Sequence, residues 1–589
     1  MLRVANTVAV LIFMLVAGGV HAQLVGNEPW RRVDGGHVLV YSNRSAAGLA
    51  DVSRGLHAFL EILTTVVGEP SGKHREPCTT MLLYEDRRSL DALLRHAGSA
   101  SPRGFVMRTP DTTYLVSADA SDVYGDVARS YLRAHHPSMP AWLENGLRQT
   151  LGAYRHEPSR LVVAVPRREH LRWLSRNAPF DLEPLVNTAD ARQMDATDYE
   201  VLSWALTQLL LFETPRGFES LHRYLELTRT GGDALRSFEE AFGLDVKSAG
   251  DALRVWLSQK VLTPYEQSAD RNPAWETRQA TRSEVLLHHG NVLLHGGEEN
   301  RAVAIGVYRE AVAEDSNNAG ARAMLGIALK ESGRREEAIE HLAAATRADV
   351  ANPLAFLAHA ELLLERSGRR GIRFGDSDPP PAAVLEARAL LRRSIALDRS
   401  LAPAWAALAK TWIFDRAGFD EGIAAADESL AIGPRSEDAA LSLVLLHLRK
   451  NDIERAAESL ERRLRPIARQ ATIDVAERGI IAWKLHRANT LAQAGELARA
   501  SALVAEVMAT AADETLRTRL ALDMEQIELT KETIRLTEIY NRAVRATNQS
   551  QYEVALKLVE QILREARDPS LRRDAENMKR TIKAFLKRP

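Results

Sequence analysis

Apolar positions in the first half of the chain follow two different periods. Short apolar runs predict four strands, at residues 37–42, 79–84, 104–108 and 112–117. An amphipathic stretch over 46–67 predicts a helix between the first two strands. From residue 121 to about 260 the pattern is helical, apart from a short apolar run at 161–165. The first half is therefore predicted to be an α+β domain, with a small sheet followed by helices.

From about residue 283 to the C-terminus the pattern is helical throughout, and it repeats. Three pairs of residues are separated by the same 34 positions: Ala304 and Ala338, Ala311 and Ala345, Asp315 and Asp349. Gly333 stands at the end of a predicted helix, where a left-handed cap is needed. A fixed period of this kind predicts an all-α solenoid. A generic bundle rich in Ala and Leu is the alternative. Residues 513–537 predict a long polar helix before a last unit that begins at Tyr540.

The string that runs from Gly326 to Ala345 is Gly-Ile-Ala-Leu-Lys-Glu-Ser-Gly-Arg-Arg-Glu-Glu-Ala-Ile-Glu-His-Leu-Ala-Ala-Ala. It resembles the tetratricopeptide repeat family, whose unit is a helix-turn-helix. The resemblance implies about six to seven units over 283–589, with a loop insertion near 366–383. It also implies a concave groove that binds a protein or peptide partner. The groove positions implied in this way are Ile327, Lys330, Glu361, Lys410, Asn489 and Asn548.

A second resemblance covers the chain from Trp30 to about residue 262. It rests on the Trp-Arg-Arg-Val opening, the strand His-Val-Leu-Val-Tyr-Ser, and the string Trp-Leu-Glu-Asn-Gly-Leu at 142–147. The segment is similar to the peptidase MA-like (gluzincin) domain that bacteria often place ahead of tetratricopeptide repeats. In that family two His of a His-Glu-x-x-His helix bind zinc, and the Glu between them activates water. A Glu on the next helix, in Trp-Leu-x-Glu-Gly, is the third ligand.

The zinc-binding positions of that family hold no ligands in this sequence. The positions of the two His are Ala128 and Leu132, or Arg129 and Arg133 if the register shifts by one residue, and the third ligand position is Asn145. A guanidinium stays protonated and repels a cation. The resemblance therefore implies a degenerate, catalytically dead domain over 23–270, with no metal and no cofactor. A hydrolase or peptidase with a rearranged active site in this domain is the alternative, and a structural cap for the solenoid is a third reading.

The first 22 residues have the pattern of a secretory signal peptide. Arg3 precedes an apolar run at 8–16, and Val20-His21-Ala22 forms a small-x-small site before Gln23. This pattern predicts cleavage after Ala22, a periplasmic or secreted location, and no transmembrane span in the mature chain. An uncleaved membrane anchor is the alternative.

Composition excludes several classes of function. The chain has 589 residues, with 77 Lys and Arg against 78 Asp and Glu, so its net charge of -1 argues against a nucleic-acid partner. The single cysteine, Cys78, excludes an intramolecular disulfide and a thiolate zinc cluster. Together these features predict an exported scaffold that binds a partner polypeptide through its repeats.

Overall fold

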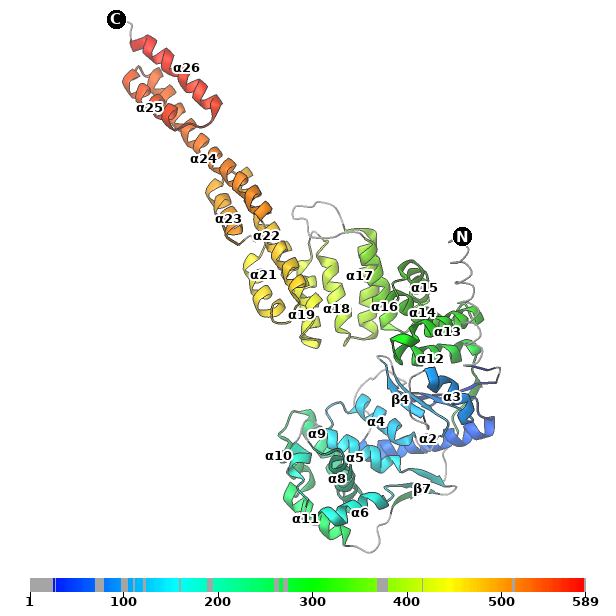
Figure 1. The fold of residues 1–589 in the computed structure, drawn as a ribbon. Helices are drawn as coiled ribbons and strands as arrows, with labels where there is room; N and C mark the ends of the chain where they lie inside the picture. The colour runs from blue at the N-terminus through cyan, green and yellow to red at the C-terminus, as the bar shows by residue number, and fades with distance from the viewer. Residues whose placement is uncertain are drawn as a thin grey trace. The chain divides into compact units, whose positions relative to one another are not determined.

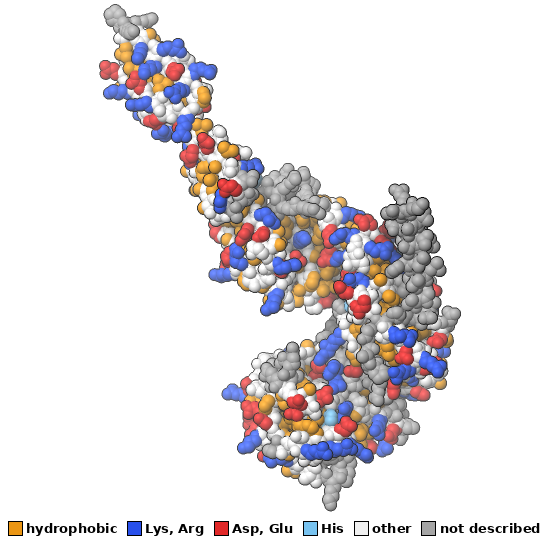
Figure 2. All heavy atoms as spheres, in the orientation of Figure 1, with side chains coloured by type: hydrophobic (Ala, Val, Ile, Leu, Met, Phe, Trp, Pro, Cys, Tyr) orange, Lys and Arg blue, Asp and Glu red, His pale blue; other side chains and the backbone are white. Residues whose placement is uncertain are grey.

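The computed structural model describes residues 25–26, 28–68, 79–96, 104–109, 112–119, 123–157, 160–178, 180–187, 194–258, 264–268, 274–367, 380–415, 417–510 and 514–586. The predicted signal peptide, Cys78 and most of the predicted insertion lie outside these residues. The chain forms two compact units, Met1–Ala355 and Phe356–Pro589 (Figure 1). Acidic and basic side chains are interspersed over the visible face of the repeats, in line with the balanced net charge (Figure 2). Among the described residues, no helix has both the length and the apolar character needed to cross a bilayer.

The first unit opens with a six-stranded sheet in the order β4-β5-β3-β2-β1-β9. Its strands are β1 (Arg31–Asp34), β2 (Val38–Ser42), β3 (Thr79–Leu83), β4 (Gly104–Arg108), β5 (Thr113–Ser117) and β9 (Thr277–Gln279). The central strands β2, β3 and β5 are parallel, whereas β4, β1 and β9 pair antiparallel. Two helices connect the strands, α2 (Ala46–Val67) and α3 (Arg87–His96). The four predicted strands and the helix over 46–67 are confirmed, and the structure adds the outer strands β1 and β9.

A helical part follows the sheet. Its helices are α4 (Tyr124–His135), α5 (Ala141–Gly152), α6 (Arg168–Asn177), α7 (Glu183–Asn187), α8 (Ala196–Gln208) with the π-helical turn η2 (Leu209–Glu213), α9 (Gly217–Arg229), α10 (Ala234–Phe242) and α11 (Val246–Leu257). A second, three-stranded sheet contains β6 (Arg155–Glu157), β7 (Arg160–Val163) and β8 (Tyr265–Ser268). Fully buried Trp142, Trp204 and Trp256 belong to one apolar core with the inner face of the first sheet.

The two faces of the first sheet pack against different partners. On one face Val40, Met81 and Leu115 join the apolar core that contains α2 and α4. Side chains alternate along a strand, so the neighbouring residues point to the opposite face. There Tyr41 and Tyr114 contact His288 of α12 (Arg282–His295), the first helix of the repeats. The repeats therefore begin as a layer of the α+β part.

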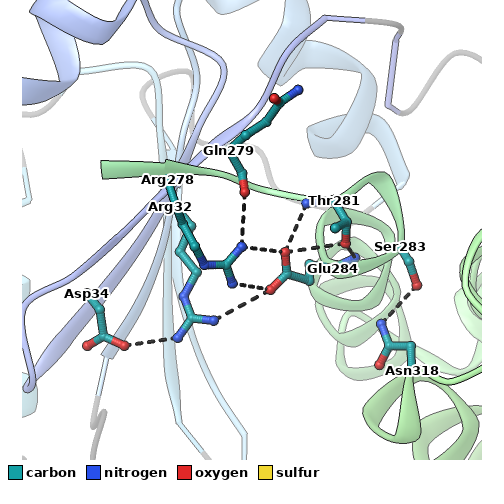
Figure 3. A network of polar contacts seen from close by, with 8 residues as sticks. All are labelled: Arg32, Asp34, Arg278, Gln279, Thr281, Ser283, Glu284 and Asn318. Carbon is teal, nitrogen blue, oxygen red and sulfur yellow. Dashed lines mark hydrogen bonds and ion pairs between the residues drawn. The ribbon is translucent and has the colours of Figure 1, made fainter. Parts of the chain in front are cut away.

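Polar contacts hold the start of α12 against the sheet (Figure 3). The Glu284 carboxylate accepts hydrogen bonds from Arg278 of β9 and from the Thr281 N–H, and Arg32 of β1 lies at 3.5 Å. Thr281 in turn accepts from the Glu284 N–H at 3.2 Å, which completes a capping box. Burial alone would raise the pKa of Glu284, but the bonds from Arg278 and Thr281 lower it to about 2.

The predicted division between residues 270 and 283 falls within the first unit. Strand β9 pairs with β1, and α12 packs on the sheet. The repeats continue with η3 (Glu298–Asn300) and the helices α13 (Arg301–Glu314), α14 (Ala319–Glu331), α15 (Arg335–Arg347) and α16 (Pro353–Arg366), which extends into the second unit. The first unit continues past the predicted boundary because β9 extends the edge of the sheet and α12, which follows it in the chain, packs on the face of the sheet.

Small residues allow the repeat helices to approach closely. A Cβ at Gly290 would overlap the Tyr308 ring, and one at Gly326 would lie 2.5 Å from the Leu342 side chain. Ala304, Ala311, Ala338 and Ala345, which carry the 34-residue period, are completely buried. Gly333 has φ +76° after the end of α14, as the sequence predicts.

The second unit continues the helical hairpins. Its helices are α17 (Ala382–Leu397), α18 (Ala402–Trp412), α19 (Phe419–Ile432), α20 (Glu437–Arg449), α21 (Ile453–Ser459) with η4 (Leu460–Leu464), α22 (Gln470–Gln493), α23 (Leu497–Thr510), α24 (Glu514–Asn548), α25 (Tyr552–Glu565) and α26 (Pro569–Leu586). The predicted polar helix over 513–537 and the start of the last unit form one continuous helix of 35 residues, α24.

Candidate functional site

Helices α4 and α5 hold the positions at which the peptidase resemblance places its ligands. Ala128 and Leu132 are completely buried in the apolar core, so their register faces away from solvent. Arg129 and Arg133 lie one residue further along the helix and are 34% and 40% exposed. Of the two registers left open by the sequence, the second therefore presents the accessible pair.

The guanidinium groups of Arg129 and Arg133 both meet Glu144 of α5. Arg133 donates to the Glu144 carboxylate at 2.7 Å through Nε, and its Nη2 lies 2.6 Å from Oε1. Arg129 Nε lies 3.4 Å from the same oxygen. Residues i and i+4 of one helix thus converge on an acidic residue of the next helix. The carboxylate faces two cations from protein side chains, and this donor set does not fit a zinc ion.

Asn145, the predicted third position, is buried and does not join this cluster. Its Oδ1 accepts a hydrogen bond from Arg148 Nη2 at 3.2 Å, while its Nδ2 has no hydrogen-bond partner. Burial lowers the pKa of the Arg148 guanidinium, and the positive charge of Arg129 lowers it further. Glu144 stands one residue before the expected ligand position, about 100° around the helix from it, so the sequence does not indicate its contact with Arg129 and Arg133. Among the described residues, no group of three or more His, Cys, Asp or Glu side chains is arranged to hold a metal ion.

Packing accounts for the Trp-Leu-x-x-Gly-Leu string of α5. Trp142, Leu143 and Leu147 are buried in the core. A Cβ at Gly146 would lie 2.5 Å from the Ser203 carbonyl oxygen of α8 and would overlap Thr207. The glycine is therefore needed for the close approach of α5 and α8.

The predicted groove positions all lie on the first helix of a hairpin. Ile327 and Lys330 are in α14, within the first unit, and both are half-buried. In the second unit, Glu361 is in α16 and Lys410 is in α18, and Lys410 is exposed. The remaining two positions are also exposed: Asn489 in α22 and Asn548, the last residue of α24.

First helices of consecutive repeats pack side by side in the second unit, where α20 contacts both α18 and α22. The exposed Lys410 and Asn489 therefore belong to one continuous row of helices. A row of this kind presents an extended surface to which a peptide or a partner helix can bind.

Sequence reasoning missed two polar clusters. One is the pair His288 and His289 on α12, which meet Tyr114 and Tyr84 at 2.8 and 2.7 Å. The other is a group of three arginines around the start of α6: Arg155, Arg167 and Arg168. Adjacent histidines in a helix form no recognised motif. The tyrosine partners of His288 and His289 lie 174 and 205 residues away in the sequence. No local pattern of residues could have indicated these partners.

Comparison with known proteins identifies the repeats. A family model described as tetratricopeptide repeat matches residues 297–362, which run from η3 into α16. A search of curated proteins found no match.

Among solved structures, the chain is similar to YrrB, described as a TPR protein with an unusual peptide-binding site (18% identity, TM-score 0.27, covering 33% of this chain and 90% of that one). It is also similar to MamA from Desulfovibrio magneticus RS-1 (17%, TM-score 0.26, 32% and 95%). A third similar structure is a tetratricopeptide repeat protein from Parabacteroides merdae (12%, TM-score 0.25, 51% and 98%). The family match establishes that this chain contains tetratricopeptide repeats.

Proposed function

We propose that this chain is an exported scaffold whose tetratricopeptide repeats bind a partner polypeptide. The observation that carries the proposal is the family match at 297–362, since repeats of this family mediate protein–protein interactions. The continuous row of first helices in the second unit supports it. The signal-like pattern of the first 22 residues supports the export part of the proposal.

Reversing the charge of Lys410 tests the groove. Lys410 is exposed on α18 and has no ion-pair partner among the described residues. If a partner lies along the first helices, Lys410→Glu is expected to weaken its binding about tenfold, since a like-charge contact replaces an attractive one. The measurement is the profile of proteins retained from an extract of the source cells' envelope, followed by titration of the retained partner.

Arg435→Glu serves as the matched control. Arg435 is also exposed, but it lies in the turn between α19 and α20 and not on a first helix itself. This variant is expected to retain the partner as the wild-type chain does. Equal retention by Lys410→Glu and the wild-type chain would count against binding at this face.

For the first domain we propose a metallopeptidase-like fold that has lost its catalytic centre. The convergence of Arg129, Arg133 and Glu144 supports this proposal, because two residues four apart on one helix and one residue on the next helix are the arrangement that a zinc site of that family requires. Two guanidinium groups stand where two imidazoles would be needed. The domain is left able to bind a polypeptide without cleaving it.

Metal content tests this reading. The mature chain, purified from zinc-supplemented growth, is expected to contain zinc far below one ion per chain in elemental mass spectrometry. The double variant Arg129→His/Arg133→His places two imidazoles opposite Glu144 and is expected to gain about one zinc per chain, because two His and one carboxylate are a sufficient protein ligand set.

The affinity tag must be removed first, since histidine tags bind zinc. Adding Glu144→Ala to the double variant is the control and is expected to abolish the gained zinc. Stoichiometric zinc in the wild-type chain would refute the loss of the centre and restore an enzyme as the leading hypothesis. A double variant that folds normally and gains no zinc would refute the correspondence of these three positions to a zinc site.

A further inference from the structure

A pocket of about 480 Å³ opens beside the N-terminus of α6 in the first unit. Two segments line it, from Ala153 to Arg155 and from Val165 to His170. Its volume is in the range of small-molecule sites. Ala153, Val165 and Pro166 supply an apolar wall, whereas the other side chains are mostly charged. The pocket is separate from the Arg129–Glu144 cluster and from the repeats.

Three arginines in the lining form no ion pair with a described residue. Arg155, Arg167 and Arg168 form no ion pair with any carboxylate in the part of the chain that the structure describes. Nearby arginines outside the lining do find partners: Arg160 pairs with Glu157 at 2.7 Å. The lining itself holds three arginines and one acidic residue, Glu169, while Glu200 of α8 acts on Arg167 from outside the lining and lies 3.9 Å from Arg148.

Arg167 is the most constrained of the three. It is half-buried, and its Nη2 donates a hydrogen bond to the Gln149 carbonyl at 3.1 Å. Burial lowers the pKa of its guanidinium, and the neighbouring Arg148 lowers it further. Burial also lowers the pKa of His170, and so does the positive charge of Arg167. The Glu200 carboxylate raises the pKa of Arg167 but forms no ion pair with it among the described residues, and a half-buried guanidinium in this position gains from a bound anion.

The backbone of the lining is held in place. Ala164, which precedes the apolar wall, is completely buried at φ +57°, a conformation that costs about 1 kcal/mol for a residue with a Cβ. Its N–H donates to the Thr150 carbonyl at 3.2 Å, and its carbonyl accepts from Gln208 Nε2 at 3.1 Å. The first turn of α6 then follows, with backbone N–H groups that have no partner within the helix. These contacts fix the backbone of the lining.

We propose that this pocket binds the phosphate group of a small phosphate monoester. The lining holds three arginines and one carboxylate, an excess of cationic side chains that suits a doubly charged phosphate, and arginine binds phosphate oxygens through parallel hydrogen bonds. The wall of Ala153, Val165 and Pro166 contacts the organic part of the ligand. Lys and Arg side chains gather in a band over α6 and β7, at the bottom of the view in Figure 2, which attracts such an anion. This site does not depend on the proposed function of the repeats.

Calorimetric titration of the full mature chain with phenyl phosphate, at constant ionic strength, tests the site. Saturable binding at one site is expected, and Arg168→Ala is expected to weaken it about tenfold, since one charge-assisted contact is lost. Arg168 is exposed, and its side chain forms no hydrogen bond or ion pair with a described residue, so the variant should fold normally. Arg172→Ala on the same helix is the matched control, because Arg172 is exposed and lies outside the lining.

Titrations with two further ligands show which part of the phosphate monoester is bound. Inorganic phosphate is expected to bind more weakly than phenyl phosphate, because it makes no contact with the apolar wall, and benzoate more weakly still. If the single variants Arg168→Ala and Arg167→Ala each bind phenyl phosphate as tightly as the wild-type chain, the proposed site is wrong. Equal affinity for benzoate would overturn the assignment to phosphate, and equal affinity for inorganic phosphate would overturn the organic part of the ligand.

Discussion

Replacement of Asp415 by Ala is expected to lower the free energy of unfolding of the second unit by about 3–5 kcal/mol. Asp415 Oδ2 lies 2.8 Å from Arg388 Nη2, and the two side chains are only 19% and 9% exposed. The guanidinium carbon also lies 3.6 Å from the centre of the Trp412 ring. Without the carboxylate, a buried cation loses its counterion. Hydrogen exchange of the peptides from α17 to α19 measures the loss, because it reports the local free energy of opening.

Two further variants separate burial from charge. The double variant Arg388→Met/Asp415→Ala removes both charges and is expected to recover most of the loss, since apolar replacements of a buried pair are often neutral. Asp420→Ala breaks the exposed Lys450–Asp420 pair and is expected to cost at most about 1 kcal/mol, because Asp420 is 79% exposed. Equal destabilisation by Asp415→Ala and Asp420→Ala would contradict the argument from burial.

The sequence pattern predicted the helices and strands that are determined by neighbouring residues in the chain. The helix over 46–67 has a Ser45 cap and an apolar face, and the structure reproduces its bounds in α2. The 34-residue period placed small residues at helix contacts, and the structure buries them there. Strand β9 escaped prediction because its three residues, Thr-Arg-Gln, are all exposed at the edge of the sheet and carry no apolar signal. Pairing with β1, not its own composition, makes it a strand.

The candidate sites were predictable only in part, because contacts between distant segments leave no local signal in the sequence. The absence of zinc ligands in α4 and α5 follows directly from the residues at those positions. The contact of Arg129 and Arg133 with Glu144 does not follow from the sequence, because it depends on how α4 and α5 pack against each other. The continuous helix α24 was divided in the prediction, since its two ends belong to separate apolar cores, around Leu520 and around Leu536. Nothing in the sequence between them stops the helix.

Acidification from pH 7 to pH 4 is expected to destabilise the first unit through two histidines of α12. Burial lowers the pKa of His289 to about 4 and that of His288 to about 3, against about 6.5 in the unfolded chain. Below pH 6.5 the unfolded state therefore binds more protons than the folded state. This stability is complete above pH 6.5 and is lost as the pH falls toward 4. Each histidine contributes a slope of about 1.4 kcal/mol per pH unit in thermal unfolding experiments.

The surroundings of His289 explain why its neutral form is favoured. Its Nδ1 lies 2.8 Å from the Val285 carbonyl, to which it donates, so Nε2 is the acceptor for the Tyr84 hydroxyl at 2.7 Å. The ring is completely buried and packs edge-on against Trp30. Burial is the main cause of its lowered pKa; the hydrogen bond to the Val285 carbonyl raises the pKa, and the positive charge of Arg282 lowers it further. A proton on Nε2 would remove the acceptor and place a charge where no carboxylate compensates it.

His289→Gln keeps a polar side chain that does not titrate, and it is expected to reduce the slope between pH 6.5 and 4.5 by about 1.4 kcal/mol per pH unit. His295→Gln, at the exposed end of the same helix, is the matched control for the substitution of a histidine by glutamine in α12. Glu284 cannot produce this slope, because its pKa is lowered to about 2 and its contribution is lost only below its unfolded value of about 4.5. An unchanged slope in His288→Gln/His289→Gln would show that these two histidines are not its source and would contradict the prediction.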